Sequence, residues 1–349
     1  MNVLVTGGAG FIGSHVSEYY AQRGDHVTIL DNLSRATLLC KNNKNARYNW
    51  DYLNKYQNIE SVQGDIRDVT TINTLAEGAD LIVHTAAQTA VTTSITDPRT
   101  DFEVNVCGTF NVLEAARKSG NHPTVIFCST NKVYGNNVNG IEISKYYSRY
   151  KFSDDKYSLG IPETFPIDHC EHTPYGCSKL AADLYVQDYA IRNEIRAGVF
   201  RMSCIYGTRQ FGVEDQGWVA WFCIAAMMGK PITIYGDGKQ VRDILYVSDL
   251  VQAFDAFVNK GKNTGCEVFN MGGGKMNTTS LLELLDLLEE LTGKKPAKVT
   301  YADWRPSDQE VYISDIRKVQ SSLGWEPTVT RTAGIRKIIE WIGDNEHLF

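Results

Sequence analysis

The sequence predicts an α/β fold in which a doubly wound parallel sheet, with helices on both faces, is joined to a smaller α/β domain. Two observations predict it. In the first half of the chain, short apolar runs alternate with amphipathic stretches, and this strand–helix–strand repetition is typical of parallel sheets. In the last third, helical patterns are separated by turns that contain Gly and Pro. The 349 residues suffice for one large or two modest domains with a sizeable core.

Apolar runs give the expected strands, and amphipathic stretches give the expected helices. The expected strands are residues 2–6, 26–30, 60–63, 81–85, 124–129 and 197–201. The expected helices are residues 13–22, 100–119, 218–228, 281–291 and 333–343. Two polar segments without clear periodicity remain. Residues 36–57 are predicted to be a surface excursion, and residues 136–170 a long loop, a feature that is often functional in compact domains.

A glycine motif follows the first expected strand. Gly7, Gly10 and Gly13 have the spacing G-x-x-G-x-x-G. The first glycine allows a tight turn, the second leaves the backbone open to a pyrophosphate, and the third lets a helix pack closely on the strand. Phe11 and Ile12 begin that helix, whose N-terminal N–H groups and positive dipole end would face the phosphates. The motif predicts a Rossmann-type dinucleotide site.

The second expected strand ends in an acidic residue, Asp31, about 20 residues after the glycine motif. A carboxylate at this place accepts hydrogen bonds from the adenosine ribose hydroxyls and repels a 2′-phosphate. The sequence therefore predicts NAD rather than NADP. Arg35 is the one nearby residue that could soften this preference.

A tyrosine and a lysine share one face of a later helix. Thr173 is a good N-cap and Pro174 suits the first helical position, so Tyr175 and Lys179 lie one turn apart. The ammonium group and an oxidised nicotinamide ring would both lower the pKa of the phenol, which would make it a general acid and base. Alternatively, the helix carries this pair by chance. The dinucleotide motif upstream favours catalysis.

Hydroxyl groups at the end of the fifth expected strand are candidates for a third catalytic group. Thr130, or Ser129, would hydrogen-bond the substrate oxygen that loses and regains a proton. The alternative is that these hydroxyls only terminate the strand. His84 also ends a strand, and we expect it to be a packed structural histidine rather than a base. Asn105 is expected to bond backbone groups.

Composition excludes several classes of function. The net charge is −6 and no Lys/Arg block is present, which argues against nucleic-acid binding. No stretch approaches the roughly 20 apolar residues of a membrane span. The eight cysteines are scattered without C-x-x-C spacing, so they are expected to be buried reduced thiols of a cytoplasmic protein, not metal ligands. The first strand follows Met1 directly, which leaves no room for a signal peptide.

Over nearly its whole length, the chain resembles the extended short-chain dehydrogenase/reductases that act on nucleotide sugars. Besides the motifs above, the matching segments are DNLSR at 31–35, GDIRD at 64–68, HTAAQ at 84–88, NVCGT at 105–109, YGTR at 206–209 and VRD at 241–243. The resemblance implies an NAD that stays tightly bound and is regenerated in each cycle, and a homo-oligomer, dimer or tetramer. Residues 1–180 would bind NAD, with a later return around 231–257, and residues 181–349 would bind mainly the nucleotide sugar.

The same resemblance implies a role for individual residues. Further cofactor-binding residues would be Asn32, Ser34, Asp65, Ile66, Ala86, Ala87, Gln88 and Ser129, together with Tyr175 and Lys179. The catalytic residues would be Thr130, Tyr175 and Lys179. The substrate would contact Thr130, Asn131, Lys132, Arg209, Gln210, Arg242, Arg305 and Asp308. Of these, Arg242 and Arg305 would hold the diphosphate. Cys204 stands where many members have an Asn that touches the substrate phosphate, so this contact must differ in detail.

Within the family, the segments 129–135, 209–219 and 307–316 resemble members that invert C2 of a CDP-hexose through a transient 2-keto sugar. This implies CDP over UDP, and a role in the biosynthesis of lipopolysaccharide O-antigen. The same catalytic residues would serve a UDP-hexose 4-epimerase, which stays the alternative. The 4,6-dehydratases have Asp-Glu where this chain has Asn131 and Lys132, so dehydration is disfavoured. A non-catalytic NAD-binding protein is disfavoured because Tyr175 and Lys179 are both present.

Overall fold

The computed structural model describes residues 1–35, 45–192, 195–260, 265–305 and 307–349. Contacts divide the chain into two compact units, which we describe separately. The first unit comprises Met1–Val133, Thr173–Arg201 and Val251–Phe269, and the second comprises Tyr134–His172, Met202–Leu250 and Asn270–Phe349. Each unit is thus built from three separate stretches of the chain.

A seven-stranded sheet forms the centre of the fold, which confirms the predicted fold class. Its strand order is β12-β8-β5-β4-β1-β2-β3, and the pairs from β3 through β2, β1 and β4 to β5 are all parallel. The strands are β1 (Asn2–Thr6), β2 (His26–Asp31), β3 (Ile59–Gln63), β4 (Leu81–His84), β5 (Thr124–Thr130), β8 (Arg196–Met202) and β12 (Cys266–Met271). The six expected strands agree within one residue at each end, whereas β12 was not predicted.

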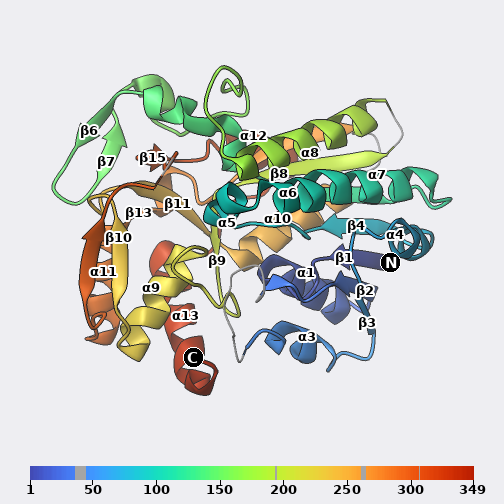
Figure 1. The fold of residues 1–349 in the computed structure, drawn as a ribbon, viewed down its shortest axis with the longest axis horizontal. Helices are drawn as coiled ribbons and strands as arrows, with labels where there is room; N and C mark the ends of the chain where they lie inside the picture. The colour runs from blue at the N-terminus through green and yellow to red at the C-terminus, as the bar shows by residue number, and fades with distance from the viewer. Residues whose placement is uncertain (36–44, 193–194, 261–264, 306) are drawn as a thin grey trace. The chain divides into compact units, whose positions relative to one another are not determined.

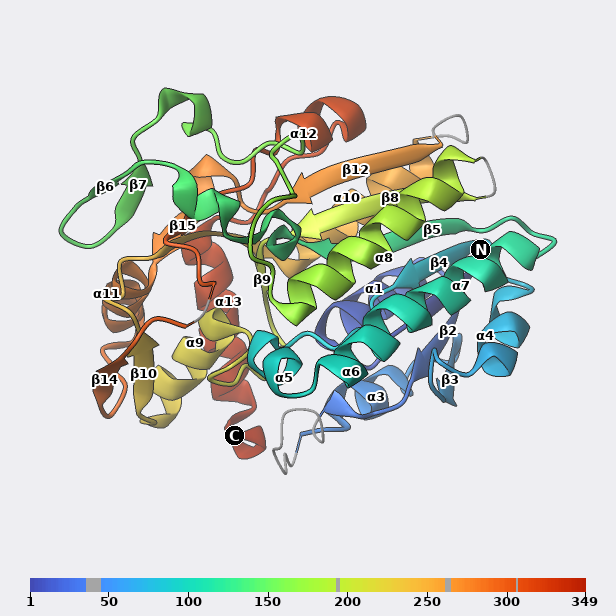
Figure 2. The same cartoon turned by 45° about the horizontal axis from the view of Figure 1, so that its top comes forward.

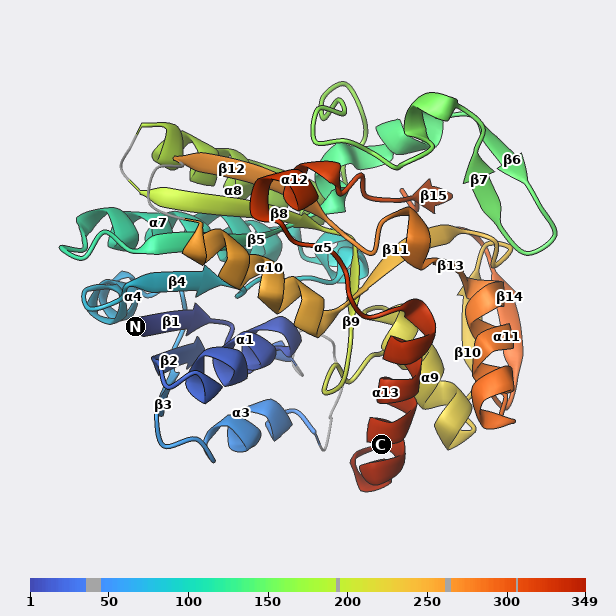
Figure 3. The ribbon, with the colours of Figure 1, turned by 180° about the vertical axis from the view of Figure 1, so that it is seen from behind.

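Helices of the first unit cover both faces of this sheet. On one face lie α4 (Val69–Ala76), α6 (Pro98–Phe102), α7 (Gly108–Lys118) and α8 (Pro174–Ile191), as Figure 2 shows. On the other face lie α1 (Phe11–Gln22) and α10 (Val247–Asn259), which Figure 3 shows in front of the strands. Figure 1 places α5 (Val91–Thr96) next to α6. A parallel sheet needs this double cover because both of its faces are apolar.

A large apolar cluster fills the space between the sheet and α4, α7 and α8. Leu4, Ile82 and Phe127 contribute from the strands, and Val112 and Val186 contribute from the helices, all of them buried. This rigid layer fixes the carboxyl ends of β1, β4 and β5, where the predicted site residues begin.

The expected helix 100–119 is interrupted. Asp97 caps α6 by accepting a hydrogen bond from the backbone of Thr100, and Pro98 occupies its first turn. Residues Glu103–Cys107 then form a π-helical turn before α7 begins. Such turns insert one extra residue and often occur at functional sites. Here the turn carries the buried Asn105.

The polar segment 36–57 only partly matches its description as a surface excursion. Residues 36–44 lie outside the described ranges. The remainder contains α3 (Tyr48–Leu53), which buries Trp50 and Leu53. Tyr56 donates a hydrogen bond to Glu18 of α1 at 2.9 Å. Tertiary contact with α1 therefore stabilises α3, a helix that the composition of this segment did not indicate.

The second unit is the smaller α/β part that the sequence predicted. Its helices are α9 (Trp218–Met228), α11 (Leu281–Thr292), α12 (Arg317–Leu323) and α13 (Arg331–Asp344). Its strands are β9 (Cys204–Tyr206), β10 (Ile232–Tyr235), β11 (Val241–Tyr246), β13 (Thr278–Ser280), β14 (Val299–Ala302) and β15 (Val311–Tyr312). The segment expected to be a long loop contains the antiparallel hairpin of β6 (Ile143–Lys145) and β7 (Tyr150–Phe152).

The cysteines correct one expectation. The seven that the structure describes are all thiols rather than disulfides, as expected, but Cys107 and Cys177 are exposed rather than buried. Within the described ranges, no group of three or more His, Cys, Asp or Glu side chains is placed to hold a metal ion. In the part of the chain that the structure describes, no helix is both long and apolar enough to cross a membrane.

Candidate functional site

The glycine motif forms the turn between β1 and α1. Gly7 has a φ of 70°, and a Cβ there would lie 2.6 Å from the backbone nitrogen of Ala86. A Cβ at Gly13 would overlap the carbonyl oxygen of Gly7. By contrast, a Cβ at Gly10 would meet only backbone atoms of Gly7. A Cβ at this middle glycine would lie 3.0 Å from the Gly7 carbonyl oxygen. Gly10 directly precedes α1, and the N–H groups at this helix N-terminus can receive a phosphate.

Asp31 at the end of β2 fastens this turn. Its Oδ2 accepts a hydrogen bond from the backbone N–H of Ala9 at 3.0 Å, and its Oδ1 accepts one from Leu33 at 2.8 Å. Burial raises the pKa of the Asp31 carboxyl, while bonds from Leu33, Ala9 and Gly10 oppose the rise. The carboxylate therefore orients the loop in addition to the ribose contact expected of it.

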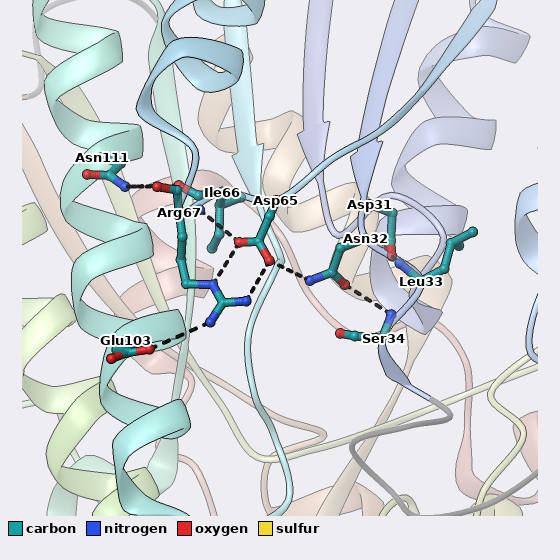
Figure 4. Close-up of polar contacts among 9 residues, drawn as sticks. All are labelled: Asp31, Asn32, Leu33, Ser34, Asp65, Ile66, Arg67, Glu103 and Asn111. Atoms are coloured by element: carbon teal, nitrogen blue, oxygen red, sulfur yellow. Dashed lines mark hydrogen bonds and ion pairs between the residues drawn. The ribbon is translucent and has the colours of Figure 1, made fainter.

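A second acidic residue lies beside Asp31 (Figure 4). Asp65 follows β3 and accepts a hydrogen bond from Asn32 Nδ2 at 2.9 Å. The Arg67 guanidinium binds both carboxylate oxygens, at 3.0 and 2.8 Å. Hydrogen bonding by Arg67 is the main cause that lowers the pKa of Asp65 to about 2. Arg67 also lies 3.7 Å from Glu103. The sequence analysis did not single out Arg67, although it forms part of the GDIRD segment.

Other residues at this end are also held by local contacts, which Figure 4 shows. The backbone of Ser34 donates to Asn32 Oδ1 at 3.0 Å. Ile66 is buried, and its carbonyl accepts a hydrogen bond from Asn111 of α7 at 3.1 Å. Arg35 is half-buried, and burial lowers its pKa. Asn111 was not predicted, because only the tertiary structure brings α7 to this loop.

The loop after β4 carries Ala86, Ala87 and Gln88. The nitrogen of Ala86 lies next to Gly7, as described above. Gln88 is buried, and both ends of its carboxamide are used internally. Its Nε2 donates to the carbonyl of Ala90 at 2.9 Å, and its Oε1 accepts from the Ala90 N–H at 2.5 Å. Its side chain therefore shapes the loop, which leaves the loop backbone to line a cofactor.

His84 and Asn105 behave as expected. Thr6 Oγ1 and Thr109 Oγ1 lie 2.6 and 2.9 Å from the two ring nitrogens of His84. Burial, with a smaller effect of the Lys179 charge, lowers the pKa of His84 to about 3, so the ring is neutral. Asn105 exchanges two hydrogen bonds with the backbone of Gln88, at 2.9 and 3.0 Å.

The structure brings Thr130, Tyr175 and Lys179 together in the first unit. Thr173 caps α8 by accepting from the backbone of Gly176 at 3.2 Å. This places Tyr175 within hydrogen-bonding reach of Thr130. The backbone N–H of Tyr175 also donates to Ser94 of α5 at 3.1 Å.

Burial controls the charges of the two residues on α8. It raises the pKa of Tyr175 to about 12, with the Thr130 hydrogen bond opposing the rise. Burial also lowers the pKa of Lys179 to about 8. The Lys179 ammonium lies 4.2 Å from the ring centroid of Phe127. The expected lowering of the tyrosine pKa by the lysine is not seen, because Lys179 is not among the groups that shift the pKa of Tyr175 and desolvation of the phenolate is the largest cause.

Ser129 points to structural partners. Its hydroxyl donates to Asp183 Oδ2 at 2.7 Å. Arg201 of β8 binds both oxygens of the same carboxylate, at 3.0 and 3.1 Å. The buried ion pair of Asp183 and Arg201, together with Ser129, links β5, β8 and α8. These contacts were not predicted, because the three residues are distant along the chain.

Asn131 and Lys132 follow Thr130 directly. The hydroxyl of Thr130 donates to Asn131 Oδ1 at 3.4 Å and accepts from the backbone of Lys132 at 3.2 Å. Asn131 is buried and Lys132 is half-buried. These contacts hold the threonine hydroxyl at the end of β5.

The other five residues predicted to contact substrate lie in the second unit. Arg242 Nη2 donates to Asp308 Oδ1 at 2.6 Å, so these two meet. Arg305 donates to Asp215 at 3.0 Å and stacks over Tyr235, 4.0 Å from its ring centroid. The structure thus gives each arginine an acidic neighbour within its own unit.

The loop before α9 is strained. Arg209 has a φ of 60° and Phe211 a φ of 47°, values that residues other than glycine adopt rarely. Gln210 Nε2 donates to the carbonyl of Ile205 at 3.1 Å. The indole N–H of Trp218 donates to Cys204 Sγ at 3.3 Å. Cys204 stands where many members of the family have an Asn, and no sequence pattern predicted its contact with Trp218. Strained backbone of this kind clusters at ligand sites.

The first unit fits a dinucleotide. Its glycine turn leads directly into the N-terminus of α1, and Asp31 lies at the end of the neighbouring strand. Residues 3–272 match the model of the NAD dependent epimerase/dehydratase family.

Comparison with known proteins extends this match to almost the full chain. The chain is 40% identical to CDP-paratose 2-epimerase from Salmonella typhi, over 98% of this chain and 99% of that protein. Among solved structures, UDP-glucose 4-epimerase from Thermotoga maritima, solved with UDP-glucose, is 32% identical with a TM-score of 0.79, over 99% of this chain and 100% of that one. UDP-glucose 4-epimerase from Thermus thermophilus, in complex with NAD, is 30% identical with a TM-score of 0.78, over 98% and 99%.

Proposed function

Because the chain belongs to the NAD dependent epimerase/dehydratase family, we propose that it is an enzyme that inverts C2 of a CDP-hexose, in the manner of CDP-paratose conversion to CDP-tyvelose. The observation that carries this choice is the similarity to CDP-paratose 2-epimerase along almost the entire chain. The reaction proceeds through a transient 2-keto sugar and uses NAD, the cofactor of the family. We also propose that the NAD stays bound between cycles.

Tyr175 is the proton carrier at the sugar. Its phenol oxygen takes the proton from the C2 hydroxyl as C2 becomes a ketone, and it returns the proton when the ketone is reduced on the opposite face. Thr130 supports this role, because its hydroxyl reaches the phenol and would also bond the reacting sugar oxygen. Thr130 is buried and Tyr175 is half-buried, so the protein shields the proton transfer from water only in part.

Lys179 supplies a positive charge one helical turn from Tyr175. When bound, NAD would supply the acceptor and donor of the hydride at the sugar carbon, and the positive charge of its oxidised ring would favour the phenolate form of Tyr175. Because burial is the largest cause that raises the pKa of Tyr175 to about 12, the tyrosine should be a competent base only in the loaded enzyme.

Arg242 and Arg305 are proposed to bind the diphosphate of the substrate. A guanidinium group can bind two phosphate oxygens at once. Asp308 and Asp215 hold the two guanidinium groups. The preference for CDP over UDP rests on the similarity to the CDP-paratose enzyme.

We further propose a homo-oligomer that works in the cytoplasm. Apolar side chains are exposed on α7 and α8, among them Phe110, Leu184 and Tyr185. A second copy that packs its own α7 and α8 on this face would cover them. The free thiols of the described cysteines suit a reducing compartment.

An NMR assay without added cofactor tests the activity. The purified protein is incubated with CDP-paratose, CDP-glucose and, in parallel, UDP-glucose. Inversion from the gluco to the manno configuration at C2 of a CDP-sugar is the expected result. A galacto product from UDP-glucose alone would instead establish a 4-epimerase, the candidate that the two solved neighbours favour. If no sugar turns over, the assay is repeated with NAD, and continued inactivity would contradict an epimerase.

The variant Tyr175→Phe tests the mechanism. It removes only the hydroxyl that carries the proton, so turnover should fall by at least about 10³-fold while NAD remains bound. Turnover is followed by NMR, and NAD is measured in the supernatant after acid denaturation. The fold should be unchanged by circular dichroism. A Tyr175→Phe protein that keeps near-wild-type turnover would refute the assignment of this tyrosine.

A further inference from the structure

A buried carboxylate that the mechanism above does not use lies next to the catalytic helix. Asp101 of α6 is fully buried, and α6 packs against α8 (Figure 2). Its Oδ1 accepts hydrogen bonds from Gln88 Nε2 at 3.0 Å and from Asn105 Nδ2 at 3.2 Å. The same Asn105 Nδ2 donates to Ser178 Oγ at 3.0 Å, one residue from Lys179.

Asp101 has few polar partners for a buried carboxyl group. Two amide N–H groups donate to its Oδ1, whereas its Oδ2 is buried without a hydrogen-bond partner. Among the described residues no arginine or lysine forms a direct ion pair with it. An isolated charge of this kind costs several kcal/mol when it is buried, so it persists only where it serves another group.

Lys179 is a buried cation near the same helix contact. It is buried, and among the described residues no carboxylate forms a direct ion pair with it. The titratable groups that face it are Asp101 on α6, Asp183 on its own helix, His84 on β4 and Cys128 on β5.

Two of those four groups carry no charge. His84 is neutral because its pKa lies at about 3. Cys128 is a neutral thiol because burial raises its pKa to about 12. The Asp183 charge acts on Lys179 at least as strongly as that of Asp101, but Asp183 also binds the Arg201 guanidinium through both oxygens. Asp101 is therefore the carboxylate near Lys179 that has no arginine or lysine bonded to it among the described residues.

We propose that Asp101 is the counter-ion of Lys179: a positioning residue whose negative charge keeps the lysine protonated inside the catalytic centre. This inference rests on the proposed function, which makes Lys179 a catalytic residue. Burial raises the pKa of Asp101, but contacts with Ser178 and Gln88 and the charge of Lys179 oppose the rise. Asp101 acts on Tyr175 as well, because a negative charge nearby raises the pKa of the phenol.

The test is the variant Asp101→Asn, which keeps the shape of the side chain and its Oδ1 acceptor. Without the negative charge, Lys179 and Tyr175 should both lose protons at lower pH. Both limbs of the profile of kcat/KM against pH should therefore move to lower pH by about one unit. Asp97→Asn is the matched control, because it removes a charge from the exposed cap of the same helix and Asn still caps well. The control should leave both limbs in place.

Two further measurements separate a charge effect from a structural one. Asp101→Glu keeps the charge, so its limbs should stay at the wild-type pH even if the maximum rate falls. A maximum that falls in Asp101→Asn while both limbs stay in place would overturn the proposal. If Asp101→Asn does not fold, the ¹³Cγ resonance of Asp101 in the wild-type protein decides. The proposal expects a carboxylate at pH 7, and a protonated Asp101 there would overturn it.

Titration of Lys179 itself separates this inference from the proposed function. The ¹³Cε resonance of Lys179, assigned with Lys179→Met, is followed against pH in enzyme without substrate. Its midpoint should fall by about one unit in Asp101→Asn. A wild-type protein that turns over no nucleotide sugar would defeat the proposed function, yet the shift in this midpoint would still establish the counter-ion. An unchanged midpoint in an active enzyme would defeat the counter-ion alone.

Discussion

Burial decides the charge of several individual residues in the first unit. His84, Cys128, Tyr175 and Lys179 all shift toward their neutral forms because water is excluded from them. Asp65 shifts the other way, because Arg67 stabilises its charged form. The site therefore has a dry centre around Tyr175 and a charged, partly exposed end around Asp65.

His84 links this dry centre to stability. Its pKa is about 3 in the folded protein and about 6.5 in an unfolded chain. Between these values the unfolded state binds a proton that the folded state does not. The contribution is therefore fully present above pH 6.5 and is lost as the pH falls toward 3. From pH 7.5 to 5.0, His84 should lower the free energy of unfolding by about 2 kcal/mol.

The variant His84→Asn isolates this effect. It should be less stable at every pH because Thr6 and Thr109 lose a partner, but the extra loss between pH 7.5 and 5.0 should disappear. Urea unfolding of both proteins at the two pH values measures the difference. Equal losses in the wild type and the variant would mean that His84 is not held neutral.

The role of a residue could be predicted only where a short motif in the sequence indicates it. The glycine turn, Asp31 and the pair of Tyr175 and Lys179 follow from short motifs, and the structure places each at the end of a strand or on one helix face. Asp101 and Arg67 lie within matching segments, but their roles arise from contacts between distant parts of the chain. No spacing in the sequence reveals such contacts.

At the scale of elements, the packing of α1 against β1 depends on Gly13. A Cβ at this position would overlap the Gly7 carbonyl oxygen and lie 2.8 Å from Thr85 Oγ1. The variant Gly13→Ala should therefore displace the turn, lower the free energy of unfolding by about 1–3 kcal/mol and reduce NAD retention. Gly78→Ala is the control, because a Cβ there meets no atom within 4 Å. The control should change stability by less than about 0.5 kcal/mol.

Urea unfolding and the amount of NAD released per chain on denaturation measure both variants. If Gly13→Ala retains NAD like the wild type, the close packing at this glycine does not shape the cofactor site.

Elements were predictable where apolar runs are uninterrupted. The central strands are buried on both faces, so each reads as a continuous apolar run whose limits lie within one residue of the structure. The strand β12 and the helix α3 were missed, because β12 mixes polar and apolar residues and α3 is stabilised by contact with α1. The expected helix 100–119 contains a π-helical turn, because Asn105 bonds to the loop after β4 rather than only within its helix.

At the scale of the whole molecule, the predicted site residues fall in both units. The residues predicted to bind the cofactor and to catalyse the reaction, with Asn131 and Lys132, belong to the first unit, and the two arginines predicted to bind the diphosphate belong to the second. The motifs that predict the cofactor are short and lie within the unit that carries the parallel sheet. This is why sequence motifs identify the cofactor readily, whereas spacing in the sequence does not identify the substrate.

The proposed homo-oligomer depends on the outer face of α7 and α8. Leu184 and Tyr185 are 48% and 45% exposed, and the ring of Phe110 contacts that of Tyr185 at a centroid distance of 5.8 Å. If two copies pack through this face, Leu184→Glu buries an unpaired charge at the contact and should weaken association at least tenfold. Val69→Glu is the control, because it changes an equally exposed apolar residue on α4, where an acidic first-turn residue suits the helix.

Sedimentation velocity across a range of protein concentrations measures the association. The wild type and Val69→Glu should sediment as the same oligomer, while Leu184→Glu should shift toward monomer as the protein is diluted. Circular dichroism should show an unchanged fold, because position 184 faces outward in the single chain. A wild type that sediments as a monomer at every concentration would refute the oligomer. An oligomer that resists Leu184→Glu would place the contact on another face.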